Sequence, residues 1–319
     1  MEAAVSKFKH DAVVADIGET HLRFAVADTD TLTIDHYVQF ASATFASLEQ
    51  ALAAYLRSLP SSPPVLAIAK ANGALPPHEE LERKFADTHR GAWRHVQILD
   101  SVDALSLILP DLAPHDLVYL GGGEADPGAA KAVASIGNAL EVGVLTQVNG
   151  SWIQFHAQAG GLSFAPQTQE ELDILERVRC DSDHVSIEHL LSGPGFAHLY
   201  EILLESSGQP VRALAPAHIV AAGLQGNDRC ATTALNYFAA WLGRFAGDMA
   251  LLYDARGGIY LWGPLLRKME SLLRNGAFRL AFEAKGRRSG WLSQIPVLLI
   301  RSEDAVLRGA AKALIQKML

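Results

Sequence analysis

Apolar runs separated by polar turns near the amino terminus predict three antiparallel strands. Residues 12–17, 22–28 and 33–40 are rich in Val, Ile and Phe. Short strands joined by tight turns are typical of a meander. Apolar residues at helical spacing in "FASLEQALAAYLRSL" (45–59) then predict a helix, which the following "PSSPP" ends.

Helices and strands alternate in the pattern as far as residue 112. The apolar run 65–71 and "HVQIL" (95–99) predict buried strands, whereas "HEELERKFADTHR" (78–90) predicts an exposed helix. "SVDALSLILPDL" (101–112) predicts the start of a further helix. A meander followed by this alternation predicts a mixed α/β domain whose sheet is largely covered.

A second unit is predicted beyond this point, beginning with strands. Apolar runs with glycine punctuation cover 116–122 and 132–158, and the "NGS" at 149–151 is typical of a hairpin turn. Residues 168–255 have a mostly helical pattern. Two more strands and a closing helix are predicted from "GGIYLWGPLL" (257–266), "IPVLLIRS" (295–302) and "AVLRGAAKALIQKM" (305–318).

The composition indicates a folded protein of 319 residues, with 49% hydrophobic and 19% charged residues. A net charge of −8 argues against nucleic acid or an anionic membrane as a partner. Cys180 and Cys230 lack metal-ligand spacing, so we expect reduced thiols in a cytosolic protein. We see no signal peptide and no apolar run of roughly 20 residues, so we expect a soluble, cytoplasmic protein without a membrane partner.

The order of landmarks along the chain resembles that of the bacterial ATP-dependent glucokinases, members of the hexokinase–actin superfamily. The resemblance covers nearly the whole chain. The segments that carry it are "ADIGETHLRFAVAD", "QILDSVDALSLILP", "LGGGEADPGAAKAVASIGNALEVGV", "SFAPQTQEELDILERVR", "HVSIEHLLSGPGFAHLYEIL", "WLGRFAGDMALLYDARGGIYLWG", "FRLAFEAKGR" and "IPVLLIRSEDAVLRGAAKAL".

The resemblance implies a two-domain actin/hexokinase-like (ribonuclease H-like) α/β fold with a cleft between the domains. The expected domains are a small one, residues 1–112 completed by the C-terminal helix 303–319, and a large one, residues 113–302. It also implies ATP and Mg²⁺ as cofactors, a hexose as ligand, a homodimer, and phosphorylation of glucose to glucose 6-phosphate in glycolysis. We identify no metal ligand of the protein itself.

The first phosphate loop of the family, D-[IV]-G-G-T-N, is matched by residues 16–21. Asp16, Gly18 and Thr20 are kept, and the resemblance makes them cofactor-binding residues. Glu19 replaces the second glycine, which puts a side chain and a negative charge where backbone should approach phosphate. The alternative is a hairpin that persists because it belongs to the core sheet.

The second phosphate loop of the family, G-T-G-L-G-V, is matched by residues 137–142. Gly137 is kept, Asn138 replaces the phosphate-facing Thr, and Glu141 replaces the last glycine. On the adenine side Gly263 is kept, and Pro264 replaces a second glycine and removes one N–H donor. These changes predict weakened ATP binding.

The catalytic carboxylate of the family lies in N-D-[FY]-x-A. Alignment on "ALSLILP" places Asp100 at the Asn position and Ser101 at the position of the base. The direct interpretation is that the base is lost. Asp100 or Asp103 taking over the role is one alternative, although a shift of one residue at a strand end turns a side chain to the opposite face. A helix cap at Asp100 or Ser101 is another.

The sugar-binding motif of the family, P-G-E-G-G-H-x-D-F-A-P, is matched by "HAQAGGLSFAP". Gln158 replaces the sugar-binding Glu, Gly161 the His and Ser163 the Asp. Glu188 aligns with a second sugar-contacting Glu and is kept, although an exposed acid on a helix flank would look the same. We therefore predict Gln158 and Glu188 as the substrate-binding residues.

Two hypotheses follow from this pattern of kept and altered residues. The first is a glucokinase-type sugar kinase whose catalysis is impaired or lost, because the base and the phosphate loops are altered. The alternative is a non-catalytic binding or regulatory paralogue, a pseudoenzyme, or a kinase for a different sugar.

Overall fold

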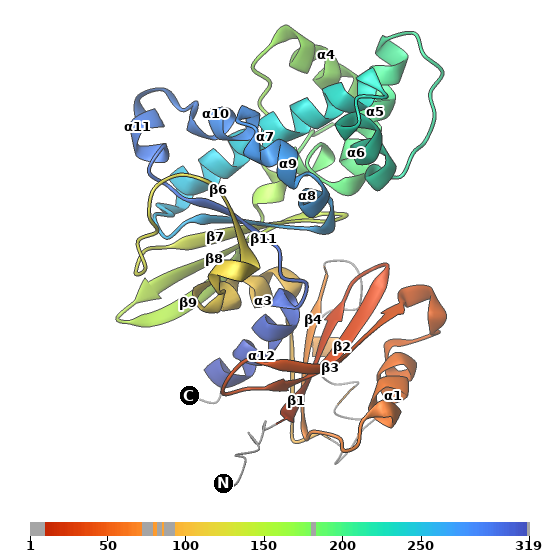
Figure 1. The fold of residues 1–319 in the computed structure, drawn as a ribbon, viewed down its shortest axis with the longest axis vertical. Helices are drawn as coiled ribbons and strands as arrows, with labels where there is room; N and C mark the ends of the chain where they lie inside the picture. Colours follow the sequence, from red (N-terminus) through yellow and green to blue (C-terminus); the bar gives the residue numbers. More distant parts are fainter. Residues whose placement is uncertain (1–9, 72–78, 82–84, 86–92, 180–182, 318–319) are drawn as a thin grey trace, which may run out of the picture. The chain divides into compact units, whose positions relative to one another are not determined.

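The protein, in a computed structural model, divides into two compact units (Figure 1). Unit 1 comprises residues 1–112 and 302–319, and unit 2 comprises residues 113–301. The residues that the structure describes are 10–71, 79–81, 85, 93–179 and 183–317. Most of the helix expected at 78–90, and Cys180, lie outside them, whereas Cys230 is a buried free cysteine.

Unit 1 is built on a five-stranded sheet in the order β3-β2-β1-β4-β5. The first three strands form the predicted antiparallel meander, and β4 and β5 add to β1 in parallel. The strands are β1 (His10–Ile17), β2 (His21–Asp28), β3 (Ile34–Ala41), β4 (Val65–Lys70) and β5 (His95–Asp100).

Helices pack on both faces of the unit 1 sheet. On one face α1 (Leu48–Ser58) buries Leu52 and Tyr55 against alternate strand residues, among them Ile17 and Ile68. On β1 and β4 lies α12 (Ala305–Lys317), which also packs against α3 (Ser101–Ile108). A Cβ at Gly309 would come within 2.0 Å of the Ala104 carbonyl oxygen, so the small-residue pattern of α12 serves close helix packing.

Unit 2 is built on a six-stranded mixed sheet in the order β6-β11-β10-β7-β8-β9. The Asn149-Gly150 turn has φ values of 50° and 81° and joins β8 to β9, which confirms the predicted hairpin. The strands are β6 (Leu117–Gly121), β7 (Lys131–Ile136), β8 (Leu140–Val148), β9 (Ser151–Ala157), β10 (Ile259–Trp262) and β11 (Val297–Ile300).

A layer of helices covers one face of the unit 2 sheet (Figure 1). Its centre is α7, which buries Phe238, Leu242 and Phe245 and packs along α10. The sequence pattern did not predict α8 to α11. The helices are α4 (Gln169–Val178), α5 (Gly193–Ser206), α6 (Pro216–Leu224), α7 (Arg229–Tyr253), α8 (Pro264–Lys268), α9 (Glu270–Arg274), α10 (Ala277–Glu283) and α11 (Ser289–Leu292).

Single turns of 3-10 helix connect these elements. Two of them carry predicted site residues or their neighbours: η4 (Ala159–Gly161) follows β9, and η6 (Ile187–His189) precedes α5. The remaining turns are η1 (Ser42–Thr44), η2 (Leu109–Asp111), η3 (Pro114–Asp116) and η7 (Gly286–Arg288).

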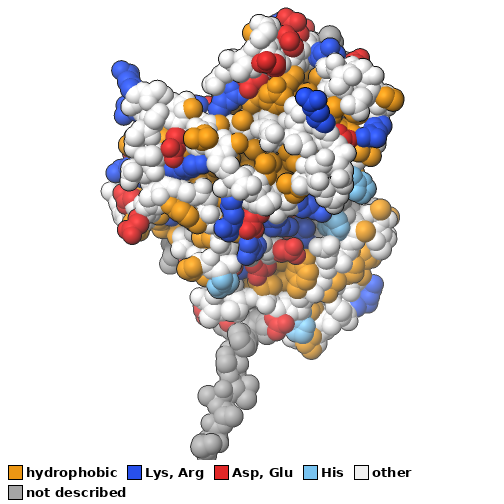
Figure 2. Space-filling model, turned by 45° about the horizontal axis from the view of Figure 1, so that its top comes forward, with side chains coloured by type: hydrophobic (Ala, Val, Ile, Leu, Met, Phe, Trp, Pro, Cys, Tyr) orange, Lys and Arg blue, Asp and Glu red, His pale blue; other side chains and the backbone are white. Residues whose placement is uncertain are grey.

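The surface carries charges of both signs. Figure 2 shows Lys and Arg side chains interspersed with Asp and Glu over the face that it presents. Large exposed hydrophobic side chains include Leu252 at the end of α7 and Leu280 in α10. Within the described residues, no helix combines the length and the apolar character that crossing a membrane requires.

Candidate functional site

In unit 1 the predicted site residues gather where the parallel strands β1, β4 and β5 end. Ile17 pairs with Lys70, and Lys70 pairs with Asp100, so the three strands stop at one level. In α/β sheets, ligands bind outside the carboxyl ends of the strands. The predicted phosphate turn follows β1 and leads into β2, and α3 follows β5 directly.

One face of this edge carries a buried carboxylate with two partners. Asp16 is 4% exposed, and Arg23, its partner across β1 and β2, places a guanidinium nitrogen 2.7 Å from the carboxylate. The Ser101 hydroxyl donates to the other Asp16 oxygen at 3.4 Å. Burial raises the pKa of Asp16, while the charge and hydrogen bond of Arg23 and the hydrogen bond of Ser101 act in the opposite direction.

The opposite face of the same edge carries a second ion pair. Paired residues on neighbouring strands share a face, and Ile17 belongs to the core against α1. Lys70 and Asp100 therefore lie on the α1 face, and the Lys70 ammonium is 3.4 Å from the Asp100 carboxylate. Asp100 occupies the N-cap position of α3 but makes no side-chain cap hydrogen bond.

The predicted first phosphate loop is a hairpin turn between β1 and β2. The Gly18 N–H donates to the His21 carbonyl at 2.9 Å, and the Thr20 hydroxyl lies 2.9 Å from His21 Nδ1. Ser42, which directly follows β3, stabilises the turn. Its N–H donates to the Thr20 carbonyl, and its hydroxyl donates to the Gly18 carbonyl. Glu19 is exposed. The turn is thus kept as a structural unit, and the residue that carries the extra carboxylate is exposed.

In unit 2 the predicted second phosphate loop is the turn between β7 and β8. The Gly137 N–H donates to the Ala139 carbonyl at 3.0 Å, which closes the turn. The Gly137 carbonyl accepts from the Gly193 N–H at 2.8 Å, so the turn rests on the first residue of α5. Glu141 follows in β8 and is 9% exposed.

The predicted sugar contacts converge on the same turn. Glu188, in η6, accepts a hydrogen bond from the Leu140 N–H at 2.8 Å. A Cβ at Gly160 would lie 2.3 Å from the Leu140 carbonyl oxygen and 3.3 Å from a Glu188 carboxylate oxygen. Gln158 is exposed and precedes η4, where its carbonyl accepts from the Gly161 N–H. Backbone contact therefore unites the turn, the segment 158–161 and Glu188.

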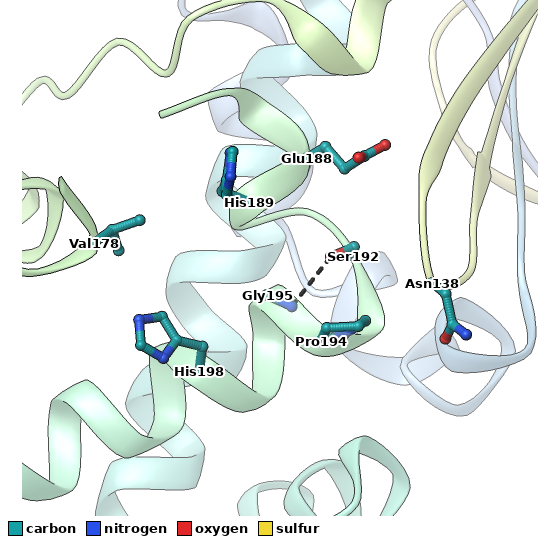
Figure 3. Close-up of a pocket in the computed structure, with 8 residues that line it drawn as sticks. All are labelled: Asn138, Val178, Glu188, His189, Ser192, Pro194, Gly195 and His198. Carbon is teal, nitrogen blue, oxygen red and sulfur yellow. Dashed lines mark hydrogen bonds between the residues drawn. The ribbon is translucent and has the colours of Figure 1, made fainter. Parts of the chain in front are cut away.

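A pocket of about 320 Å³ lies beside this junction (Figure 3). Asn138 and Glu188 are the predicted site residues in its wall, and Figure 3 shows Glu188 and His189, neighbours in η6, pointing in different directions. The dashed line in Figure 3 marks the Gly195 N–H donating to the Ser192 hydroxyl, which caps α5. The lining residues are Asn138, Val178, Glu188, His189, Ser192, Pro194, Gly195 and His198.

Gly263 is required by packing. Its φ is 149°, and a Cβ there would lie 2.2 Å from the Ile136 carbonyl oxygen. Pro264 is the first residue of α8, where a backbone N–H has no partner within the helix. Gly263, which follows β10, thus packs closely against Ile136 at the end of β7. Pro264 starts α8 without the loss of a helical hydrogen bond.

The structure therefore forms two groups of the predicted residues, one in each unit. Sequence reasoning missed Arg23 and Lys70 in unit 1 and His189 and His198 in unit 2. A charged residue ending the apolar run "VLAIAK" was a usable signal for Lys70. Asp16, Gly18, Thr20, Asp100 and Ser101 form the unit 1 group, and Gly137, Asn138, Gln158, Glu188 and Gly263 form the unit 2 group.

Known proteins resemble this chain over nearly its whole length. The glucokinase family model matches residues 13–317. A glucokinase of Tolumonas auensis is 31% identical over 312 residues, which cover 96% of this chain and 97% of the relative.

Solved structures of glucokinases are also similar to this chain. A glucokinase from an Antarctic psychrotroph has a TM-score of 0.82 at 30% identity, with 96% of this chain and 98% of that one covered. A Balamuthia mandrillaris glucokinase, solved in complex with glucose, has a TM-score of 0.78 at 18% identity, with 97% and 95% covered. The predicted two-domain actin/hexokinase-like fold is confirmed, and the chain belongs to the glucokinase family.

Proposed function

We propose that this chain is an ATP-dependent sugar kinase of the glucokinase family that binds a hexose but transfers the phosphoryl group far more slowly than an ordinary kinase. The proposal rests on the residues at the end of β5 and on the contacts that they make. Ser101 stands at the position of the base with its hydroxyl donating to Asp16, and Asp100 is paired with Lys70 on the opposite face.

Transfer to a sugar hydroxyl requires a base within hydrogen-bonding reach of that hydroxyl. A serine hydroxyl is a poor proton acceptor at neutral pH, and a positioned base contributes roughly 10²–10⁴-fold to the rate. Asp100 does not take over by a small rotation, because its strand position directs it to the α1 face. The loss of rate is therefore expected even with both ligands bound.

Two carboxylates also oppose the nucleotide phosphates. Glu19 lies in the first predicted phosphate turn, and Glu141 follows the second. Like charges about 4 Å apart cost on the order of 1 kcal/mol in water and more at a protein surface. We infer weakened ATP binding, with Mg²⁺ arriving on the nucleotide, whose phosphate oxygens are its usual ligands.

Hexose binding is supported by the unit 2 group. Glu188 is fixed by the Leu140 N–H and keeps oxygens that can accept from sugar hydroxyls, and Gln158 offers an exposed amide two residues before Gly160. The relative from Balamuthia mandrillaris was solved with glucose, which makes glucose the first hexose to test.

The activity test is a coupled ADP-release assay with Mg²⁺, ATP and a panel of hexoses. We expect a kcat with glucose well below roughly 1 s⁻¹, the low end of ordinary kinase rates. A kcat above that value would contradict the proposal. Undetectable turnover together with undetectable hexose binding would favour the non-catalytic alternative.

A separate binding measurement tests the hexose site. Glu188→Gln should weaken glucose binding about tenfold in calorimetry, because a charge-assisted hydrogen bond is lost. Glu170→Gln is the matched control, since Glu170 is an exposed acid on α4 that does not line the pocket. Equal affinities in the two variants would remove Glu188 from the site.

A further inference from the structure

Lys70 is a buried cation at the end of a central strand. It is 7% exposed, and its ammonium lies 3.4 Å from a carboxylate oxygen of Asp100, whose side chain is 22% exposed. Neither the base nor the phosphate turn of the family pattern accounts for a lysine at this position. The segment "VLAIAK" contains none of the family motifs described above.

Among the described residues, the Lys70 ammonium is incompletely satisfied. An ammonium group has three N–H donors, and among the described residues Asp100 is its one polar partner. At 3.4 Å that contact is longer than the 2.7–2.9 Å typical of a close charge-assisted bond. Because buried charges are normally paired and hydrogen-bonded, this ammonium has capacity left for another acceptor.

The location points to a ligand as that acceptor. Lys70 ends β4, which lies between β1 and β5 in the sheet. Its strand neighbours are Ile17, one residue before the phosphate turn, and Asp100, one residue before the family's base position. Ligands bind outside the carboxyl ends of such strands. A cation here also offsets the negative charge that Glu19 brings to the turn.

We propose that Lys70 contacts an oxyanion of the bound ligand, and that Asp100 holds the ammonium in place until that oxyanion arrives. The oxyanion is a phosphate oxygen of the nucleotide or the carboxylate of an acidic sugar. The proposal rests on the proposed function in that it assigns Lys70 to the same ligand site, but it concerns binding and not the rate of transfer.

The two members of the ion pair give opposite predictions. Lys70→Met should weaken binding of the oxyanion about tenfold, since a charge-assisted contact is lost. Asp100→Asn should leave it unchanged or tighten it about threefold, since it removes the competing carboxylate. A purely structural pair predicts no such difference, because each variant breaks the same contact.

Calorimetry on the full chain, without turnover, measures these affinities. The probes are inorganic phosphate, Mg²⁺ with the non-hydrolysable ATP analogue AMPPNP, and D-glucuronate, with neutral glucose for comparison. If the nucleotide supplies the oxyanion, Lys70→Met weakens AMPPNP; if an acidic sugar does, it weakens glucuronate. Glucose affinity should stay within about twofold in both cases.

Arg57→Met is the matched control, because Arg57 is an exposed cation at the end of α1 and its loss changes the net charge equally. Equal weakening by Lys70→Met and Arg57→Met, or by Lys70→Met and Asp100→Asn, overturns the proposal. If Lys70→Met does not fold, Asp100→Asn decides alone: unchanged or tighter binding supports the proposal and weaker binding contradicts it. A fast kcat with glucose would defeat the proposed function but leave these affinities as they are.

Discussion

Different kinds of contact stabilise the ends of the strands in unit 1 and the ends of the strands in unit 2. In unit 2 the close contacts involve backbone atoms: Gly160 lies against the Leu140 carbonyl, Gly263 lies against the Ile136 carbonyl, and the Glu188 carboxylate accepts from the Leu140 N–H. In unit 1 they are between side chains, with Asp16 bound to Arg23 and Ser101, and Lys70 bound to Asp100.

This difference explains how the fold of a family can persist while part of its chemistry changes. A glycine in contact with backbone cannot be replaced unless a strand moves, so the unit 2 edge resists substitution. A side-chain pair can be exchanged for another pair without moving any strand. We therefore expect Gly160 and Gly263 to tolerate substitution less well than the side-chain pairs of unit 1.

The largest effect is expected at Glu171, which forms a side-chain ion pair with Arg244 in unit 2. If this pair proved dispensable, the comparison of the two units would fail. The Glu171 carboxylate accepts from Arg244, from Trp241 Nε1 at 2.8 Å and from the Gln167 N–H at 2.7 Å. Glu171→Gln should lower the free energy of unfolding by about 3–5 kcal/mol, because it leaves a largely buried guanidinium without its counter-charge. Glu170→Gln, an exposed neighbour on α4, should change it by less than about 0.5 kcal/mol.

The same pair predicts a pH dependence. Burial alone would raise the pKa of Glu171, but the hydrogen bonds from Arg244, Gln167 and Trp241 outweigh it and lower the pKa below the usual 4.5. The folded state therefore binds the proton less tightly, and the stabilisation is present above pH 4.5 and lost as the pH falls through the lower, folded-state pKa. Urea unfolding should show wild type and Glu171→Gln converging in acid. A constant difference from pH 7 to pH 3 would contradict this.

The next effect tests the backbone contact itself. Gly160→Ala should cost about 2–3 kcal/mol, because its Cβ would overlap the Leu140 carbonyl and push β8 away from η4. It should also weaken glucose binding, since Glu188 bonds the same residue of β8. Gly161→Ala is the control, as no atom lies within 4 Å of its Cβ position. Similar losses in both variants would mean that backbone contact does not hold this edge.

Much of the fold was predictable because it rests on local patterns. The meander, the Asn149-Gly150 hairpin and the long helix α7 follow from strand alternation, turn chemistry and helical spacing. The helices α8 to α11 were not predicted, because each has only 4–7 residues and too few turns to show a period.

The candidate site was predictable in part. Asp16 and Glu188 could be aligned to family motifs, whereas their partners were not identified. Arg23 meets Asp16 through antiparallel register, and Lys70 meets Asp100 through parallel register across 30 residues of chain. The turn of a hairpin fixes its register, so Arg23 was open to prediction, whereas no local pattern fixes the register of parallel strands joined by a long connection.

A smaller effect is expected from the charges in the two phosphate turns. Glu19→Gly and Glu141→Gly should each tighten binding of AMPPNP with Mg²⁺ by about threefold to tenfold, since each removes a negative charge expected near phosphate. Glu19→Gln and Glu141→Gln separate the charge from the side chain's bulk. Glu124→Gln, an exposed acid in a unit 2 loop, controls for net charge. An unchanged affinity in the double variant would show that repulsion does not limit nucleotide binding.

The smallest effect is expected where the family pattern would suggest the largest. Ser101→Asp restores a carboxylate at the base position, yet we expect kcat with glucose to change by less than about threefold. The new carboxylate would lie beside buried Asp16, whose carboxylate Ser101 now stabilises by donating a hydrogen bond, and the turns would still carry Glu19 and Glu141. Ser101→Asn is the neutral control in the same ADP-release assay. A gain of a hundredfold for Asp over Asn would mean that the base alone is missing, and that the ligand contacts of both edges are already sufficient for catalysis.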